Sequence, residues 1–136
     1  MAGKLRFGLA GCGDFGKHLG GYLLEVADIT GLCDVNRTRI GETARALNLD
    51  VPHFTDYQEM FQRGGLDAVG ITAANYAHAE ITVAAARAGL HVFCEKAMAR
   101  TVPECWGMVR ACQANDVKLM IGHKRRLRPP WARLIN

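Results

Sequence analysis

The sequence lacks any long apolar segment and any paired-cysteine framework. No apolar run among its 136 residues approaches the ~20 needed to cross a bilayer, and no cleavage-like region follows the short apolar stretch near the N-terminus. The five cysteines are an odd number and contain no C-x-x-C pair, whereas disulfide frameworks of secreted proteins favour even numbers. We therefore expect a cytoplasmic protein with reduced thiols, without a signal peptide and without a membrane partner.

Acidic residues are absent from residues 117–136, although this segment carries six basic ones. In a chain of net charge +4, this imbalance fits either a nucleic-acid arm or a segment whose acidic partners are absent from this chain. Aromatic residues make up only 7% of the sequence, and neither a stacking surface nor a recognisable docking motif is visible. We therefore expect no nucleic-acid partner.

Six short apolar runs alternate with stretches of helical periodicity. The runs are Leu5–Ala10, Ile29–Cys33, Pro52–Phe54, Leu66–Ile71, Leu90–Cys94 and Val117–Ile121. Runs that are apolar throughout are typical of parallel strands covered on both faces, and repeated strand–helix–strand units require right-handed crossovers. The pattern predicts an α/β fold in one domain, a doubly wound parallel sheet with strand order 3-2-1-4-5-6.

Three of the intervening helices have specific signals. The first is expected to bury one stripe of side chains, formed by Phe15, Leu19, Tyr22, Leu23 and Val26. Residues 76–89 are rich in alanine and end in a glycine, which suits a helix C-terminus. Residues 101–104, Thr-Val-Pro-Glu, have the form of a capping box with proline inside the first turn.

A G-x-G-x-x-G motif at residues 11–16 follows the first predicted strand and opens the first helix. Gly11 permits the tight turn, Gly13 lets the backbone approach a pyrophosphate closely, and Gly16 lets the helix pack against the strand. The helix N-terminus faces the phosphate charge. An isolated motif of this kind also fits an ordinary glycine turn. Its strand–turn–helix context favours dinucleotide binding, with Asp14 and Phe15 among the contacting residues.

Asp34 ends the second predicted strand, 18 residues after Gly16. An acid at this position can accept hydrogen bonds from the adenosine ribose hydroxyls, and the alternative is an ordinary surface acid at a strand end. Asp34 would repel the 2′-phosphate of NADP, whereas Arg37 would attract it. These residues are compatible with NAD and with NADP, and we favour NAD.

Three further polar clusters each follow a later predicted strand. They are Thr72–His78, Glu95–Ala97 and Gly122–Arg126. Ligands of open α/β sheets bind at the carboxyl ends of the strands, so polarity confined to this edge indicates a binding crevice. No set of histidine, cysteine and carboxylate residues has a recognised metal-ligand spacing, so we expect no metal site.

Taken together, these features resemble the N-terminal domain of the glucose–fructose oxidoreductase/inositol dehydrogenase (Gfo/Idh/MocA) family. The matching features are the glycine loop, Asp34, Asn75 with His78, Glu95-Lys96 and the Gly122–Leu127 stretch. The resemblance covers essentially the whole chain. It implies a Rossmann domain over residues 1–127 that binds NAD or NADP. Residues 128–136 would begin a linker helix towards a second domain, which in this family supplies most of the substrate pocket and is absent here.

The same resemblance implies roles for individual residues. Lys96 would lie near the nicotinamide and the substrate, where it positions or polarises a reacting hydroxyl or carbonyl, and His78 would lie in the same crevice. Lys96 and His78 are thus the catalytic candidates. The cofactor-binding candidates are the loop residues 11 and 13–16 with Asp34, Arg37, Thr72, Asn75, Glu95 and Lys96.

Four positions depart from the family pattern. Ala97 replaces the proline of Glu-Lys-Pro, and Ala73-Ala74 replaces Thr-Pro before Asn75. Because a cis bond before a non-proline residue costs roughly 2.5–4 kcal/mol, we expect the Lys96–Ala97 peptide to be trans. Lys124 stands where an uncharged polar residue is more usual.

The resemblance implies hydride transfer between NAD(P) and a hydroxyl-bearing carbon of a sugar, cyclitol or polyol. The alternative is a dinucleotide-binding module without turnover, and we expect this chain alone to bind rather than to catalyse efficiently. A methyltransferase with a similar glycine loop would leave Glu95-Lys96 without a role. We also expect a homo-oligomer or marginal solubility, because Trp131, Leu134 and Ile135 would form an exposed apolar face.

Overall fold

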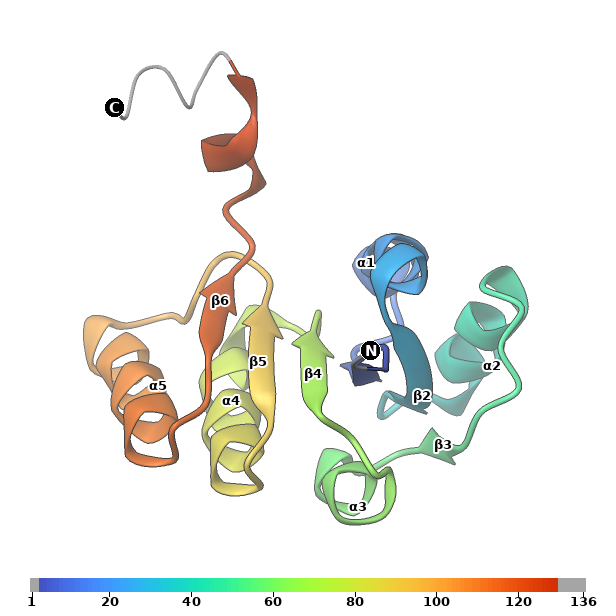
Figure 1. The fold of residues 1–136 in the computed structure, drawn as a ribbon, viewed down its shortest axis with the longest axis horizontal. Helices are drawn as coiled ribbons and strands as arrows, with labels where there is room; N and C mark the ends of the chain where they lie inside the picture. Colours follow the sequence, from blue (N-terminus) through green and yellow to red (C-terminus); the bar gives the residue numbers. More distant parts are fainter. Residues whose placement is uncertain (1–2, 130–136) are drawn as a thin grey trace.

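A parallel sheet of six strands forms the centre of the molecule (Figure 1). The structure, a computed structural model, describes residues 3–129. The strands are β1 (Arg6–Ala10), β2 (Asp28–Cys33), β3 (His53–Phe54), β4 (Ala68–Ile71), β5 (His91–Cys94) and β6 (Leu119–Ile121). Each predicted apolar run overlaps one of them. Their order is β3-β2-β1-β4-β5-β6, so the predicted doubly wound topology is confirmed.

Helices link successive strands and cover both faces of the sheet. They are α1 (Asp14–Val26), α2 (Arg37–Ala46), α3 (Tyr57–Arg63), α4 (His78–Arg87) and α5 (Val102–Ala114), with short 3-10 helices η1 (Asn75–Ala77) and η2 (Lys124–Leu127). Helices α1 and α2 pack on one face over β1 and β2, whereas α3, α4 and α5 pack on the other. No described helix has the length and apolarity that a membrane crossing requires.

Polar side chains fix the starts of three helices. The Asn36 side chain accepts a hydrogen bond from the Thr38 N–H at the start of α2, and Asp56 accepts one at the start of α3. At α5, Thr101 and Glu104 form the predicted capping box, each side chain accepting a hydrogen bond from the other's backbone N–H. These caps set where each chain segment leaves the carboxyl edge of the sheet.

The predicted buried stripe of α1 is wrong for three of its five residues. Phe15, Tyr22 and Val26 are exposed, while Leu23 is buried and Leu19 is partly buried. The buried face of the helix is formed instead by Gly16, Gly20 and Leu23. A Cβ at position 20 would lie 2.5 Å from the Leu47 side chain, so the helix packs closely against Leu47 at this glycine. The apolar pattern missed this face because glycines carry it.

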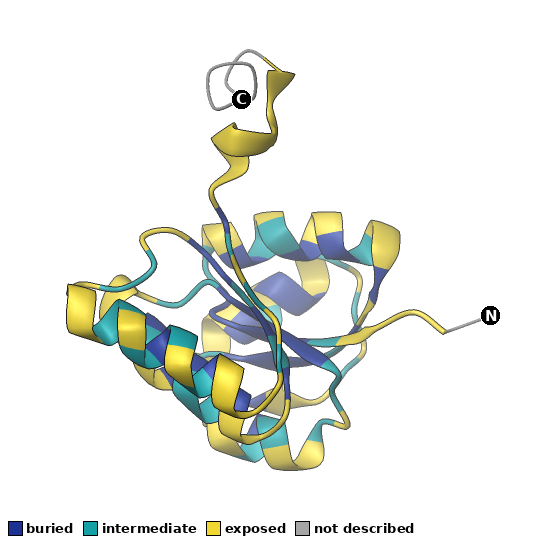
Figure 2. Ribbon diagram, turned by 60° about the vertical axis from the view of Figure 1, so that its left-hand side comes forward, coloured by how far each residue is buried: buried dark blue, intermediate teal, exposed yellow. Residues whose placement is uncertain are grey.

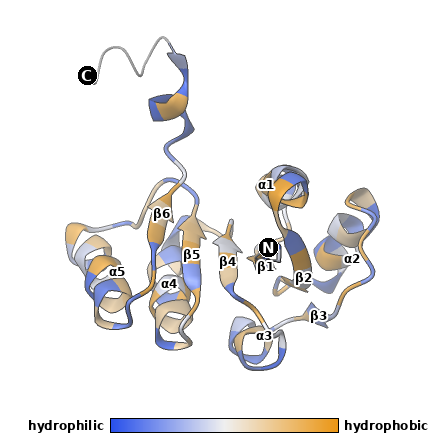
Figure 3. Ribbon diagram, in the orientation of Figure 1, coloured by the Kyte–Doolittle hydropathy of each residue, from blue (hydrophilic) through white to orange (hydrophobic). Residues whose placement is uncertain are grey.

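Residues 123–129, which follow β6, rise away from the body of the molecule (Figure 1). Buried residues run along the strands and the inner faces of the helices, whereas residues 123–129 are exposed (Figure 2). The segment around η2 is also mostly hydrophilic (Figure 3). Apart from residues 128 and 129, the predicted linker helix lies outside the described residues, as do Trp131, Leu134 and Ile135.

Candidate functional site

The loops that carry the predicted site residues leave one edge of the sheet. The last residues of four neighbouring strands, β1, β4, β5 and β6, are in register with one another. They are Ala10, Ile71, Cys94 and Ile121. The segments that follow these residues therefore begin at one level of the carboxyl edge. This edge carries the glycine loop together with the polar clusters that begin at Thr72, Glu95 and Gly122.

The three glycines of the loop meet different surroundings. Gly11 has φ +106°, and a Cβ there would lie 2.5 Å from the backbone of the Thr72–Ala73 segment. A Cβ on Gly16 would lie 2.2 Å from the Gly11 carbonyl oxygen, so helix and loop touch directly at this point. A Cβ on Gly13 would meet nothing within 4 Å. Gly11 and Gly16 are thus required by the fold, whereas Gly13 leaves open space above the backbone.

This open space adjoins the N-terminus of α1. Gly13 is the N-cap residue and has no side chain to accept a hydrogen bond from the first turn. The N–H groups there and the positive end of the helix dipole together favour an anion. Asp14 lies in the first turn but is exposed, and its carboxylate lies 3.8 Å from Lys17 Nζ. The local geometry therefore fits a phosphate group placed against the Gly13 backbone.

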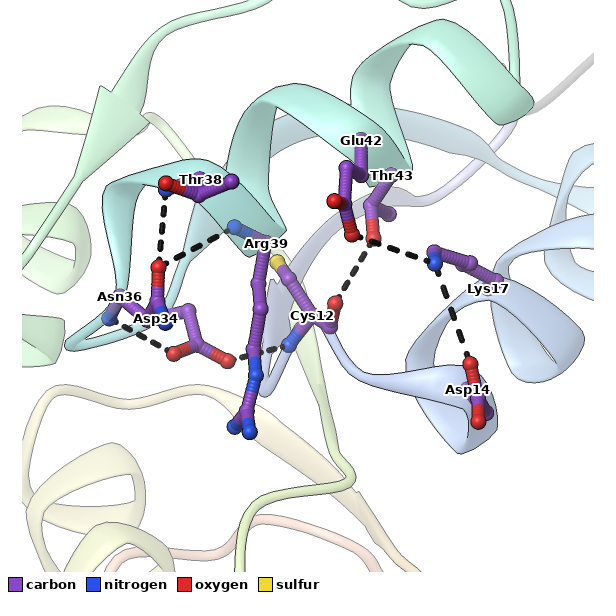
Figure 4. A network of polar contacts seen from close by, with 9 residues as sticks. All are labelled: Cys12, Asp14, Lys17, Asp34, Asn36, Thr38, Arg39, Glu42 and Thr43. Atoms are coloured by element: carbon purple, nitrogen blue, oxygen red, sulfur yellow. Dashed lines mark hydrogen bonds and ion pairs between the residues drawn. The ribbon is translucent and has the colours of Figure 1, made fainter.

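Asp34 binds the glycine loop directly (Figure 4). Its Oδ2 accepts a hydrogen bond of 2.9 Å from the Cys12 N–H, and its Oδ1 accepts one of 2.8 Å from the Asn36 N–H. The carboxylate therefore holds the loop after β1 and the turn after β2 in one arrangement. The remaining lone pairs on both oxygens can accept further hydrogen bonds from a ligand.

Thr43 supports the same loop from α2, a contact that the sequence did not indicate. Its hydroxyl is fully buried and donates a hydrogen bond of 2.9 Å to the Cys12 carbonyl. Burial, reinforced by the nearby Asp34 charge, raises the pKa of the Cys12 thiol to about 12. The thiol therefore stays protonated at neutral pH, and the loop carries no thiolate that would repel a phosphate.

A cavity of about 240 Å³ lies between Asp34 and the loop after β4. We call it the Asp34 cavity. Its lining includes Gly11, Gly13, Asp34, Arg39, Thr72 and Tyr76. Arg39, which was not among the predicted site residues, lines it, whereas the predicted Arg37 does not. Which of two nearby arginines faces the edge depends on how α2 lies against the sheet, and local sequence does not reveal that.

A second cavity, of about 200 Å³, collects most of the remaining predicted residues. We call it the Lys96 cavity. It is lined by Phe15, Thr72, Ala73, Asn75, His78, Glu95 and Lys96. Thr72 lines both cavities, and its hydroxyl donates a hydrogen bond of 2.7 Å to the Gly11 carbonyl. A ligand that extends from the Asp34 cavity past the glycine loop can therefore reach Lys96.

His78 ties two loops together beside the Lys96 cavity. The side chain is buried, with Nδ1 2.8 Å from the Ala97 carbonyl and Nε2 2.8 Å from the Ala73 carbonyl. Both ring nitrogens are thus engaged with the backbone. These contacts connect the loop after β4 to the loop after β5, which carries Lys96. The peptide between Lys96 and Ala97 is cis, so the predicted trans form is wrong.

Glu95 lies behind Lys96 and is nearly enclosed. Its Oε2 accepts a hydrogen bond of 3.3 Å from the Lys96 N–H, and its Oε1 lies 3.7 Å from Lys124 Nζ. A third and larger cavity, of about 610 Å³, opens next to this pair. We call it the basic cavity, and it is lined by Lys96, Gly122, His123, Lys124, Arg125 and Arg126. Lys96 therefore borders both the Lys96 cavity and the basic cavity.

Comparison with known proteins identifies the family of the chain. Residues 5–123 match the Gfo/Idh/MocA oxidoreductase family, NAD-binding Rossmann fold. The chain is 37% identical over 120 residues to 2,7-anhydro-N-acetylneuraminate hydratase of Mediterraneibacter gnavus, covering 86% of this chain and 31% of that protein. It is 31% identical over 136 residues to inositol 2-dehydrogenase of Salmonella typhimurium, covering 97% of this chain and 40% of that protein.

Solved structures of other oxidoreductases have the same fold as this chain. The WlbA dehydrogenase from Bordetella pertussis, crystallised with NADH and UDP-GlcNAcA, superposes with a TM-score of 0.90 at 27% identity. The match covers 97% of this chain and 41% of that one. An oxidoreductase from Agrobacterium radiobacter, crystallised with NAD+ and L-tartaric acid, has a TM-score of 0.88 at 25% identity and covers 94% and 38%. The chain thus spans less than half the length of these relatives.

Proposed function

Because the chain belongs to the Gfo/Idh/MocA oxidoreductase family and comprises its NAD-binding Rossmann domain, we propose that it holds NAD for hydride transfer at a hydroxyl-bearing carbon of a sugar or cyclitol. When bound, NAD supplies the hydride acceptor, and its reduced form supplies the donor. The observation that carries the proposal is the open space over Gly13 at the N-terminus of α1, directly beside the Asp34 carboxylate. One ligand with a pyrophosphate and a ribose fits both features.

We assign the parts of the dinucleotide to the cavities in order along the sheet edge. The pyrophosphate lies over the Gly13 backbone, and the adenosine ribose donates hydrogen bonds to Asp34. Thr72 and Asn75 contact the nicotinamide half in the Lys96 cavity, because both line it. Asp34 repels a 2′-phosphate, so NAD binds more tightly than NADP, although Arg39 in the same cavity offers NADP some compensation.

Lys96 is the residue we assign to the reacting oxygen of the substrate. It borders the nicotinamide-side cavity and the larger cavity next to it, so a substrate seated between them would contact its ammonium group. A hydrogen bond from this group polarises a carbonyl and orients a hydroxyl. His78 acts as a positioning residue, because both of its ring nitrogens already contact backbone carbonyls.

The substrate class comes from the relatives. Inositol 2-dehydrogenase and a D-apiose dehydrogenase of Paraburkholderia graminis are named for a cyclitol and a sugar. A cytoplasmic location is also part of this proposal. It is supported by the five cysteines, which are all free thiols.

Calorimetric titration with NAD+ and with NADP+ tests the proposal. The intact chain should bind NAD+ more tightly than NADP+. Gly13→Val should remove binding without unfolding the protein, because the added side chain fills the open space and meets no protein atom near its Cβ. Gly21→Val is the matched control, since position 21 also has nothing within 4 Å but lies away from the loop. An intact chain that is folded and binds neither dinucleotide would refute the proposed function.

A further inference from the structure

We propose that Thr43 is a positioning residue for the cofactor, because its buried hydroxyl orients the Gly13 N–H towards the pyrophosphate. The inference rests on the proposed function and adds a residue to the same site. It depends on three observations: the hydrogen bonds of Cys12, the peptide between Cys12 and Gly13, and the anchoring of α2.

Both backbone groups of Cys12 are held by side chains from other parts of the chain (Figure 4). Its N–H donates a hydrogen bond of 2.9 Å to Oδ2 of Asp34, which follows β2. Its carbonyl oxygen accepts one of 2.9 Å from Oγ1 of Thr43, which belongs to α2. Cys12 and Thr43 are both fully buried, so this carbonyl has no access to solvent and depends on the hydroxyl for its hydrogen bond.

The peptide between Cys12 and Gly13 links this contact to the direction of the next N–H. The peptide is trans. In a planar trans peptide the carbonyl and the N–H point in opposite directions. Because the Cys12 carbonyl points towards Thr43 on α2, the Gly13 N–H points away from α2. The Thr43 hydroxyl therefore fixes the direction of an N–H that belongs to another residue.

The Gly13 N–H has no hydrogen-bond acceptor within residues 3–129. The N–H groups of Gly11 and Cys12, by contrast, donate to the Cys33 carbonyl and to the Asp34 carboxylate. A Cβ on Gly13 would meet nothing within 4 Å, so a ligand atom can approach this part of the backbone. An N–H beside the N-terminus of α1 favours an anionic acceptor. A phosphate oxygen there would complete the hydrogen bonding of the loop.

Helix α2 is anchored in a way that keeps Thr43 in place. Asn36, whose side chain caps the helix, donates its own N–H to Asp34 Oδ1 at 2.8 Å. Near the other end of the helix, Glu42 Oε2 lies 3.7 Å from Lys17 Nζ of α1. Asp34 and α2 thus hold the glycine loop from two sides. Removing the Thr43 hydroxyl should free the carbonyl side of the loop and leave the Asp34 contact intact.

Substitutions at position 43 test the inference. Thr43→Val and Thr43→Ala both remove the hydroxyl, and Thr43→Val keeps the branched shape, whereas Thr43→Ser keeps the hydroxyl. Adenosine, ADP and inorganic pyrophosphate are titrated into each intact chain, following backbone NMR signals of Gly13 and Asp34. We expect the valine and alanine variants to bind ADP and pyrophosphate about tenfold more weakly than the parent, which corresponds to ~1.4 kcal/mol. Adenosine, which has no phosphate, should bind equally to all chains, and Thr43→Ser should keep most of the ADP affinity.

Thr82→Val is the matched control, because Thr82 is equally buried but lies in α4 on the other face of the sheet. It should leave the binding of all three ligands unchanged. Unchanged ADP and pyrophosphate affinity in Thr43→Val would overturn the inference, as would an equal loss for adenosine or a loss that Thr43→Ser shares. A parent chain that binds pyrophosphate at Gly13 but no NAD+ would count against the proposed function alone. A parent chain that binds neither pyrophosphate nor ADP would overturn both.

Discussion

Asp34 uses both of its carboxylate oxygens inside the protein, and this gives it two roles at once. It accepts hydrogen bonds from the N–H groups of Cys12 and Asn36, which belong to two different loops. Asp34 also lines the Asp34 cavity. A residue that looks like a simple ligand contact therefore also sets the shape of the glycine loop.

Replacing Asp34 with alanine should consequently affect both stability and binding. The buried Cys12 N–H loses its acceptor, so we expect a loss of about 1–3 kcal/mol in the free energy of unfolding. NAD+ affinity should fall by about tenfold or more, because ribose hydrogen bonds to a charged acceptor are lost. Urea denaturation and calorimetry measure the two effects. Asp50→Ala is the control, since Asp50 is exposed and accepts no side-chain hydrogen bond among the described residues. Full NAD+ affinity in Asp34→Ala would contradict the assigned role.

Residue-level prediction from sequence works where a motif fixes the backbone. The glycine loop and Asp34 are set by spacing alone, and the structure places both at the carboxyl edge. Thr43 and Arg39 could not be found this way, because their contacts depend on how α2 packs against the loop. Likewise, the engagement of both His78 nitrogens by carbonyls depends on two loops that are distant in sequence.

At the scale of elements, the capping box of α5 is the clearest case of local sequence fixing local structure. Glu104 N–H donates to Thr101 Oγ1 at 3.3 Å, and Thr101 N–H donates to Glu104 Oε2 at 3.2 Å. The neighbouring Arg100 lowers the pKa of the Glu104 carboxyl through a side-chain hydrogen bond. This cap begins α5 directly after the loop that carries Lys96.

Thr101→Ala should destabilise the protein by about 1 kcal/mol, the usual effect of removing an N-cap side chain. Thr101→Ser keeps the hydroxyl and should retain most of the stability. Thermal unfolding of the two variants beside the parent measures the difference. If alanine and serine lowered the melting temperature equally, the hydroxyl contact would not be what stabilises this helix start.

Strands and helices could be predicted from the sequence where the pattern of apolar residues reflects which residues are buried. Runs rich in apolar residues overlap all six strands, because the centre of a parallel sheet covered on both faces is largely apolar. The same reasoning fails for α1, whose buried face contains Gly16 and Gly20. Glycine contributes no apolar signal, yet here it allows the helix to approach its neighbours closely.

For the molecule as a whole, the topology decides where the site lies. The chain reverses its direction of travel across the sheet between β3 and β4, so the loops after β1 and β4 diverge to opposite faces. A crevice forms at such a switch point. The alternation of strands and helices was sufficient to predict it. The exposed basic segment after β6 was predicted as a charge imbalance, but its cavity beside Lys96 required the three-dimensional arrangement.

The buried thiols should make the stability of the whole molecule fall at alkaline pH. Burial raises the pKa of Cys12, Cys33 and Cys94 from 9.0 to about 12. The unfolded chain therefore releases these protons above about pH 9, whereas the folded chain retains them until about pH 12. Stability from this source is fully present below pH 9 and decreases between those values, by about 1.4 kcal/mol per pH unit for each thiol.

Urea denaturation at several pH values measures this slope. Cys94→Ala should be less stable at neutral pH because it leaves a small void, but its stability should fall less steeply above pH 9, since one titrating thiol is gone. Cys105→Ser, which changes the partly exposed cysteine, serves as the control and should keep the steeper slope. Identical slopes for the parent and Cys94→Ala would show that the thiol ionises equally in both states.

Mapping of the NAD+ binding surface by two-dimensional backbone NMR tests the central claim most directly. Saturating NAD+ should shift signals from residues 11–16, from Asp34, and from the Thr72–Asn75 and Glu95–Ala97 loops. Signals from the opposite edge of the sheet, such as Gly89, should stay in place. This result would place one dinucleotide along the carboxyl edge, from the Asp34 cavity to Lys96. Saturable binding that left the glycine loop and Asp34 unshifted would contradict the account.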